Sequence, residues 1–284
     1  MGVFSYSPDV YFIVLDQYPR ADVLRNIFYS SNRRFLNDLR KMGFYVADRG
    51  ACNYPRTIMF IASTLNLAYL DDVLGAVPQD CTDLNLPAKN LAHNAVFSFF
   101  REHSYWTVVF APEYGAGRFG NVDLLIDSAA RLSEFDAAVI EMTPIQDLLR
   151  PFSPEFSTAE LRRRHILYTL DRLQKLPGSG LSPMFVYAHI LCPHPPIVFG
   201  PEGEPVAFGS SHDEAEDTPN TREFKRYYAG QVAFISQKIK QVVAAILARP
   251  SLRLDRAGGE RPMTGSGEEA VPFSWPKTLV HCCY

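Results

Sequence analysis

The alternation of short apolar segments with longer amphipathic ones constrains the fold of this chain more than any other feature. The apolar segments are typical of buried strands and cover residues 10–15, 44–47, 107–111, 137–140 and 184–188. Segments with apolar residues at helical spacing separate them, at residues 35–42 and near residues 57–70, 88–103, 159–175 and 220–248. Strands that alternate with helices form parallel sheets, so we expect an α/β protein with a mostly parallel sheet and helices on both faces.

The last predicted helix marks a change in the character of the chain. It stops at Pro250, and residues 251–284 contain charged clusters and several glycines but no periodicity. We therefore expect one domain over residues 1–250 and a poorly ordered tail over residues 251–284. Because another buried strand should follow such a helix, the α/β domain is predicted to be incomplete at its C-terminus.

Composition excludes several classes of partner. A net charge of -3 gives no electrostatic reason to expect binding to nucleic acid or to an anionic membrane. No stretch of about 20 apolar residues is present, so no transmembrane segment is predicted and the chain by itself is expected to be soluble. The basic run Arg162–Arg164 is interpreted as a solvated helix face.

Asp16 ends the first predicted strand. The carboxyl ends of buried parallel strands open into the crevice where α/β proteins bind ligands. From its position alone, Asp16 is either the N-cap of a helix that begins near Pro19 or a metal ligand aimed into that crevice. Both interpretations remain open on the sequence.

Thr57 lies where a loop containing Pro55 leads into an apolar helix. Thr57 or Asn53 could simply cap that helix. Alternatively, Thr57 could be a nucleophile, because the free N–H groups and the dipole of a helix start favour a bound phosphate or sulfate group. A metal ion could then lower the pKa of the hydroxyl so that it attacks at neutral pH.

Two histidines follow the predicted strand 184–188. His189 ends it, and His194 lies in the proline-rich loop after it. A single histidine is more often a hydrogen-bonded core or surface residue, but two just past the end of one strand indicate a site.

Three segments, in this order and spacing, resemble bacterial sulfatase-like hydrolases of the alkaline phosphatase superfamily. They are PDVYFIVLDQYPRADVL, FLNDLRKMGFYVADRGACNYPRTIMFIASTLNLAYLDD and FVYAHILCPHPPIVFGPEGE. The branch they resemble contains lipoteichoic acid synthases and phosphoethanolamine transferases, which are membrane-anchored. The likeness covers roughly residues 8–249. It implies an alkaline phosphatase-like fold and a location in the bacterial cell envelope.

The resemblance also implies roles for individual residues. Asp16 matches the first metal-binding acid of the family, and Thr57 matches the nucleophile, which also binds the metal. His194 resembles the histidine that contacts the substrate anion, and His189 and Asn53 are further substrate-binding candidates. An alternative register, on the sulfatase pattern Cys-x-Pro-x-Arg, would place Asn53 at the nucleophile; because an asparagine cannot attack, we prefer Thr57.

The implied reaction is hydrolysis or transfer of a phosphate or sulfate ester. The ester would be a small molecule or would be linked to a glycan or a lipid. The implied cofactor is at least one divalent cation, namely zinc, manganese, magnesium or calcium.

The sequence departs from the family in two places. Relatives carry a late strand ending in Asp-His-Gly, whose Asp and His complete the metal site, but no Asp-His pair occurs in this sequence. Gln17 stands where the branch usually has glycine. The alternative expectation is therefore a truncated or degenerate, catalytically inactive member that binds no cation and keeps only the fold and an anion-binding crevice.

Overall fold

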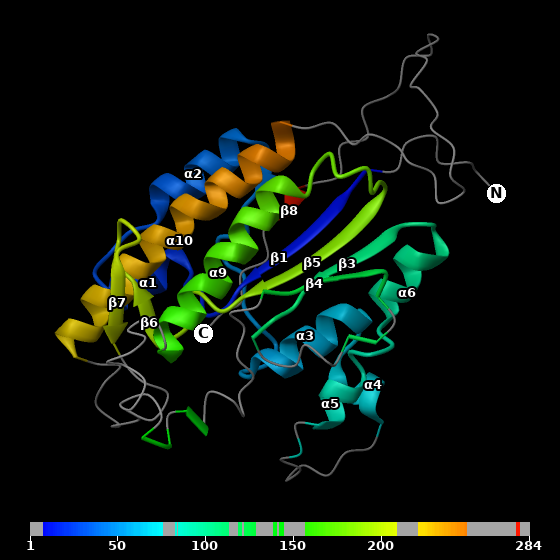
Figure 1. The fold of residues 1–284 in the computed structure, drawn as a ribbon, viewed down its shortest axis with the longest axis horizontal. Coiled ribbons are helices and arrows are strands. Elements are labelled where there is room, and N and C mark those ends of the chain that lie inside the picture. The colour runs from blue at the N-terminus through cyan, green and yellow to red at the C-terminus, as the bar shows by residue number, and fades with distance from the viewer. Residues whose placement is uncertain are drawn as a thin grey trace.

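A computed structural model describes residues 8–75, 83, 85–113, 119–120, 122–128, 139–140, 142–144, 157–208, 221–248 and 277–278. Its centre is a sheet with the strand order β1-β5-β3-β4, in which every neighbouring pair is parallel (Figure 1). The strands are β1 (Val10–Leu15), β3 (Trp106–Phe110), β4 (Leu124–Ile126) and β5 (Met184–Ile190). The predicted parallel sheet is confirmed, and β1, β3 and β5 lie where the apolar segments indicated.

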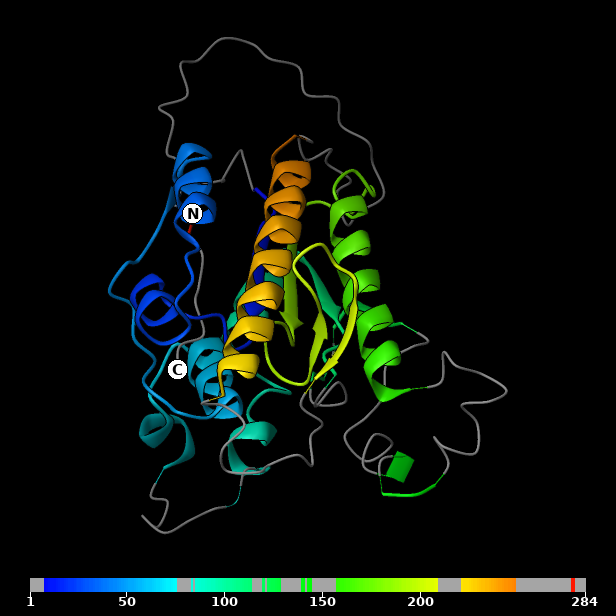
Figure 2. The ribbon, with the colours of Figure 1, turned by 90° about the vertical axis from the view of Figure 1, so that its left-hand side faces the viewer.

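Helices cover both faces of this sheet (Figures 1 and 2). One side carries α1 (Ala21–Ile27), α2 (Arg33–Lys41), α9 (Thr158–Lys175) and α10 (Arg222–Ala248). The other side carries α3 (Thr57–Asn66), α4 (Leu70–Leu74), α5 (Asn85–Lys89) and α6 (Ala95–Glu102). The protein is therefore an α/β protein with a helix–sheet–helix arrangement.

The side chains of strand β5 alternate between two hydrophobic cores, one on each face of the sheet. All seven of its residues are buried. Met184 and Val186 pack with α9 and α10, whereas Phe185 and Tyr187 belong to the cluster on the α3 and α6 side. Because side chains alternate along a strand, His189 is placed on the α3 side.

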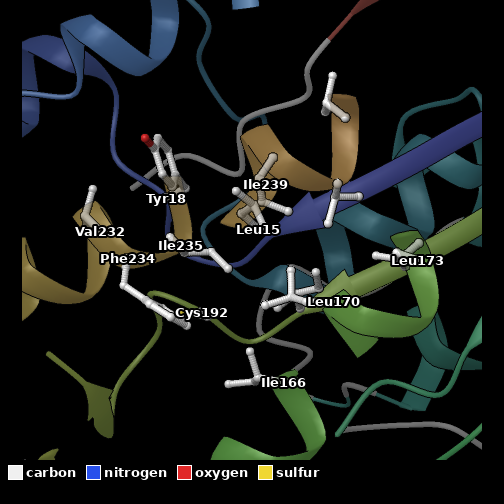
Figure 3. Close-up of a cluster of buried hydrophobic side chains, with 14 of the residues drawn as sticks. Leu15, Tyr18, Ile166, Leu170, Leu173, Cys192, Val232, Phe234, Ile235 and Ile239 are labelled. Carbon is white, nitrogen blue, oxygen red and sulfur yellow. The ribbon is translucent and has the colours of Figure 1, made fainter. Parts of the chain in front are cut away.

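The core on the other face joins α9 and α10 to the sheet. Figure 3 shows Leu15 of β1 close to Ile235 and Ile239 of α10, and Leu170 and Leu173 of α9 belong to the same cluster. Figure 2 shows α9 and α10 side by side across this face. Within the described ranges, no helix has both the length and the apolar character needed to cross a bilayer.

Some predicted elements differ from the structure. The strand expected at residues 44–47 is only β2 (Phe44–Tyr45), and it pairs with β8 (Lys277–Thr278) outside the central sheet. Of the strand expected at residues 137–140, the first two residues lie outside the described ranges, and Val139 and Ile140 are helical. The tail expected over residues 251–284 lies outside the described residues except for β8.

Other differences concern boundaries and short strands. The helix expected near residues 57–70 is divided into α3 and α4, because Leu67 adopts a left-handed conformation with φ of 55°. The segment near 88–103 is likewise divided into α5 and α6. An antiparallel hairpin of β6 (Ile197–Phe199) and β7 (Pro205–Phe208), which the sequence did not indicate, follows the proline-rich loop.

Candidate active site

Asp16 and Thr57 meet at the carboxyl end of β1. Leu15 packs toward α9 and α10, whereas Val14 belongs to the cluster on the α3 side. The alternation along the strand therefore directs Asp16, the next residue, toward α3. Thr57 is the first residue of α3, and its Oγ1 donates a hydrogen bond to Asp16, at 3.1 Å from Oδ1 and 3.4 Å from Oδ2. The fold thus joins two side chains that are 41 positions apart.

Neither residue serves as a helix cap. The N-cap position of α1 is Arg20, whose side chain makes no capping hydrogen bond and pairs with Asp22. The N-cap position of α3 is Arg56, again without a side-chain cap, so Asn53 does not cap this helix either. The N-cap interpretations of Asp16, Thr57 and Asn53 are therefore wrong.

His189 lies beside Asp16. It is on β5 directly opposite Val14, and its Nε2 is 3.4 Å from Asp16 Oδ2. Both side chains are buried, and Nε2 of His189 has no hydrogen-bond partner among the described residues. The two side chains are therefore close enough for His189 to stabilise the carboxylate of Asp16.

The surroundings keep Asp16 ionised. Burial by itself raises the pKa of its carboxyl group. This effect is outweighed by His189, by the charge of His194 and by the hydrogen bond from Thr57, so the pKa of Asp16 is lowered. At neutral pH the site holds a carboxylate that accepts the hydrogen bond of the Thr57 hydroxyl.

His194 is half-buried in the loop between β5 and β6. Its Nδ1 hydrogen-bonds the carbonyl oxygen of Pro195. Burial lowers the pKa of His194, and the charge of Asp16 opposes this shift. In the described part of the chain, no hydrogen bond or ion pair joins His194 directly to Asp16 or Thr57, but His194 lies near enough to Asp16 for their charges to influence each other's pKa.

Asn53 is not brought into this cluster. It is exposed in the loop before α3 and takes no part in the hydrogen bonds that join Asp16 and Thr57. Of the five residues expected at the site, the structure brings together Asp16, Thr57 and His189, places His194 nearby and leaves Asn53 at the surface.

The interpretation of Arg162–Arg164 as a solvated helix face is wrong for its first two residues. The side chain of Arg162 is only 8% exposed, and its Nη2 donates to the carbonyl oxygens of Leu191 at 3.1 Å and of His194 at 3.4 Å. Arg163 donates to the carbonyl oxygen of Val198 at 2.9 Å. The side chain of Arg164 is 44% exposed, as expected for a solvated position. Helical periodicity alone could not show that the loop carbonyls would meet the buried part of this run.

Glu113 is a second buried acidic residue, and it is not among the residues expected from the sequence. It lies three positions after the end of β3, its Oε2 is 3.4 Å from Nε of Arg162, and its Oε1 has no hydrogen-bond partner among the described residues. Burial raises the pKa of Glu113, whereas the charges of Arg162 and His189 oppose the shift. Glu113 follows shortly after a buried strand, as Asp16 does, so the same positional argument could have identified it from the sequence.

Asp16 and Thr57 offer two oxygen ligands for a metal ion. Their oxygens are 3.1 Å apart, a separation that fits two ligands each about 2.0–2.6 Å from one hard cation. Over the described ranges, no group of three or more His, Cys, Asp and Glu side chains is placed to bind one metal ion. A cation held by Asp16 and Thr57 alone would take its remaining ligands from water and substrate.

The chemistry of the site follows from these contacts. A hydroxyl at the start of a ten-residue helix is held by an ionised carboxylate, at the carboxyl end of a parallel strand. The helix start favours an anionic group, and the carboxylate orients the hydroxyl.

A comparison of the sequence with models of known protein families finds no match, and a comparison with curated proteins finds none either.

Proposed function

We propose that this protein is a hydrolase or transferase of phosphate or sulfate esters that uses Thr57 as its nucleophile. The observation that carries the proposal is the hydrogen bond from Thr57 to Asp16 at the start of α3. The resemblance of the three sequence segments to sulfatase-like hydrolases supports it, as does the parallel sheet. An alkaline phosphatase-like fold, a small-molecule or glycan- or lipid-linked substrate and a bacterial envelope location belong to the same proposal.

The reaction would proceed in two displacements at Thr57. The ester group would rest at the start of α3, where backbone N–H groups favour an anion. Thr57 Oγ1 would form a bond to phosphorus or sulfur while the bond to the leaving alcohol breaks, and the proton lost by the Thr57 hydroxyl would end on that alcohol. Water or an acceptor hydroxyl would then form the new bond to phosphorus or sulfur, the bond to Thr57 would break, and the proton of the attacking hydroxyl would return to Thr57 Oγ1. Asp16 would orient the hydroxyl for the first step by accepting its hydrogen bond.

A divalent cation, whether zinc, manganese, magnesium or calcium, would be held by the oxygens of Asp16 and Thr57. When bound, it would lower the pKa of the threonine hydroxyl and neutralise charge on the ester.

His194 would contact the anion in its protonated form. Because a carbonyl oxygen only accepts hydrogen bonds, Nδ1 carries the proton in the bond to Pro195. In the neutral ring, Nε2 is then an acceptor and repels an ester oxygen. We therefore infer that anion binding is coupled to protonation of His194 and strengthens as the pH falls.

A second candidate function is binding without turnover. The lack, in the described part of the chain, of a third metal-binding side chain favours it, together with the absence of an Asp-His pair from the sequence. Such a protein would keep the anion-binding crevice but not the reaction.

The test is hydrolysis of 4-nitrophenyl phosphate and 4-nitrophenyl sulfate with each of the four cations. We expect Thr57→Ala to lower kcat/KM by a factor of about 10³ or more, because the nucleophile is removed. Thr64→Ala, a matched change on the same helix, should leave the rate within about two-fold of the wild type, since Thr64 lies outside the site.

The outcomes separate the two candidates. If the Thr57→Ala protein still hydrolyses the esters at the wild-type rate, Thr57 is not the nucleophile. A wild-type protein that binds inorganic phosphate but turns over neither ester with any cation would establish the second candidate and exclude the first.

A further inference from the structure

The proline-rich loop between β5 and β6 covers residues 191–196 and has few backbone N–H groups that could donate hydrogen bonds. Pro193, Pro195 and Pro196 have no N–H group. The loop is nevertheless buried or half-buried throughout. Buried carbonyl oxygens need hydrogen-bond partners, so side chains from elsewhere must supply them.

Two helices provide these donors. Arg162 of α9 donates to the carbonyl oxygens of Leu191 and His194. Gln231 of α10 donates to the carbonyl oxygen of Pro193 at 3.0 Å. The loop backbone is therefore held by long side chains at His194 and at the residues just before it.

Arg162 has a charge partner that explains how it stays in this buried position. An uncompensated buried cation is strongly unfavourable, and the carboxylate of Glu113 lies 3.4 Å from its Nε. The planar guanidinium can bind two carbonyls and a carboxylate at fixed angles, which the single ammonium of a lysine cannot reproduce. Glu113 also lies close enough to Asp16 and His189 for their charges to influence its pKa.

We propose that Arg162, supported by Glu113, is a positioning residue that fixes His194 at the active site by binding the backbone of the proline-rich loop. The inference deepens the proposed function, because it rests on His194 as the group that contacts the substrate anion. It assigns Arg162 a role through the loop backbone and no contact with the substrate.

The test compares Arg162→Lys with Arg163→Gln. Arg163 is the matched control, because it is the next residue, is also largely buried and also donates to backbone carbonyls, but those carbonyls belong to Val198 and Gly203. The first readout is the imidazole NMR spectrum of His194, assigned with His194→Asn and followed through a pH titration. The second is the Kd for inorganic phosphate.

We expect Arg162→Lys to shift and broaden the imidazole signals of His194 and change their titration midpoint. If phosphate binds, its Kd should rise about ten-fold, and in an active enzyme kcat should fall by about ten- to a hundred-fold. Arg163→Gln should leave the signals of His194 as in the wild type. Wild-type signals of His194 in a folded Arg162→Lys protein would overturn the proposal.

If Arg162→Lys does not fold, a second variant tests the same proposal. Replacing both Arg162 and Glu113 by glutamine removes both charges of this pair together, so neither is left buried without the other. The signals of His194 should again change, and unchanged signals would overturn the proposal. Absence of ester hydrolysis in the wild type would count against the proposed function alone, because the NMR titration requires no substrate.

Discussion

Gln17 and Asp16 show how one residue can depart from an expected pattern without disturbing its neighbour. Gln17 has a φ of 58°, a left-handed conformation that disfavours residues with a β carbon by about 1–2 kcal/mol and that glycine adopts readily. Its carbonyl oxygen accepts a hydrogen bond from the hydroxyl of Tyr228. Gln17 thus occupies a backbone conformation that favours glycine, at a cost to stability, while Asp16 still reaches Thr57.

The titration of His194 leads to a prediction about stability. Burial, reinforced by the charges of Arg162 and His189 and opposed by Asp16, lowers the pKa of His194 below its value of about 6.5 in the unfolded chain. Between these two pKa values the unfolded chain binds more protons, so stability is lost as the pH falls through this window. The free energy of unfolding, measured with urea, should fall more between pH 7.5 and 5.5 for the wild type than for His194→Asn. An equal fall in both proteins would contradict the account.

At the scale of elements, the sequence predicted the strands and helices whose own residues have a clear apolar pattern. Strands β1, β3 and β5 are continuous apolar runs, and α9 and α10 have clear helical periodicity, so each was located within a few residues. Strand β4 and the hairpin of β6 and β7 have only three or four residues each, and short strands are defined by their partners more than by their own residues. The break after α3 depends on one left-handed residue, Leu67, which the apolar pattern does not reveal.

Helix α10 contributes a buried hydrogen-bond network that can be tested at this scale. Gln231 is 1% exposed, and its Oε1 accepts hydrogen bonds from the N–H groups of Val198 at 2.8 Å and Phe199 at 3.0 Å. Gln231→Met keeps the size of the side chain but leaves these donors and the Pro193 carbonyl without partners. We expect it to lower the free energy of unfolding by about 2–4 kcal/mol.

Gln237→Met is the matched control for this change. Gln237 is exposed on the same helix, so its replacement should alter the free energy of unfolding by less than about 0.5 kcal/mol. Equal effects of the two substitutions in urea unfolding would show that Gln231 does not hold the loop.

At the scale of the whole molecule, the parallel sheet assembles the site from segments far apart in the chain. Asp16 follows β1, Glu113 follows β3 and His189 lies near the end of β5, while Thr57 and Arg162 come from helices on opposite faces of the sheet. Asp16 and His189 could be predicted, because the carboxyl edge of a parallel sheet is a recurring place for sites. Arg162 could not, because its burial depends on how α9 meets a loop 29 or more positions further along.

The central claim is that Thr57 carries the transferred group, and a mass measurement during turnover tests it most directly. The wild-type protein is mixed with 4-nitrophenyl phosphate and the most active cation, quenched with acid within the first turnover and mapped by peptide fragmentation. We expect one phosphoryl group on the side chain of Thr57 and none in the Thr57→Ala protein. Turnover that leaves Thr57 unmodified, or that places the phosphoryl group on another side chain, would contradict the claim.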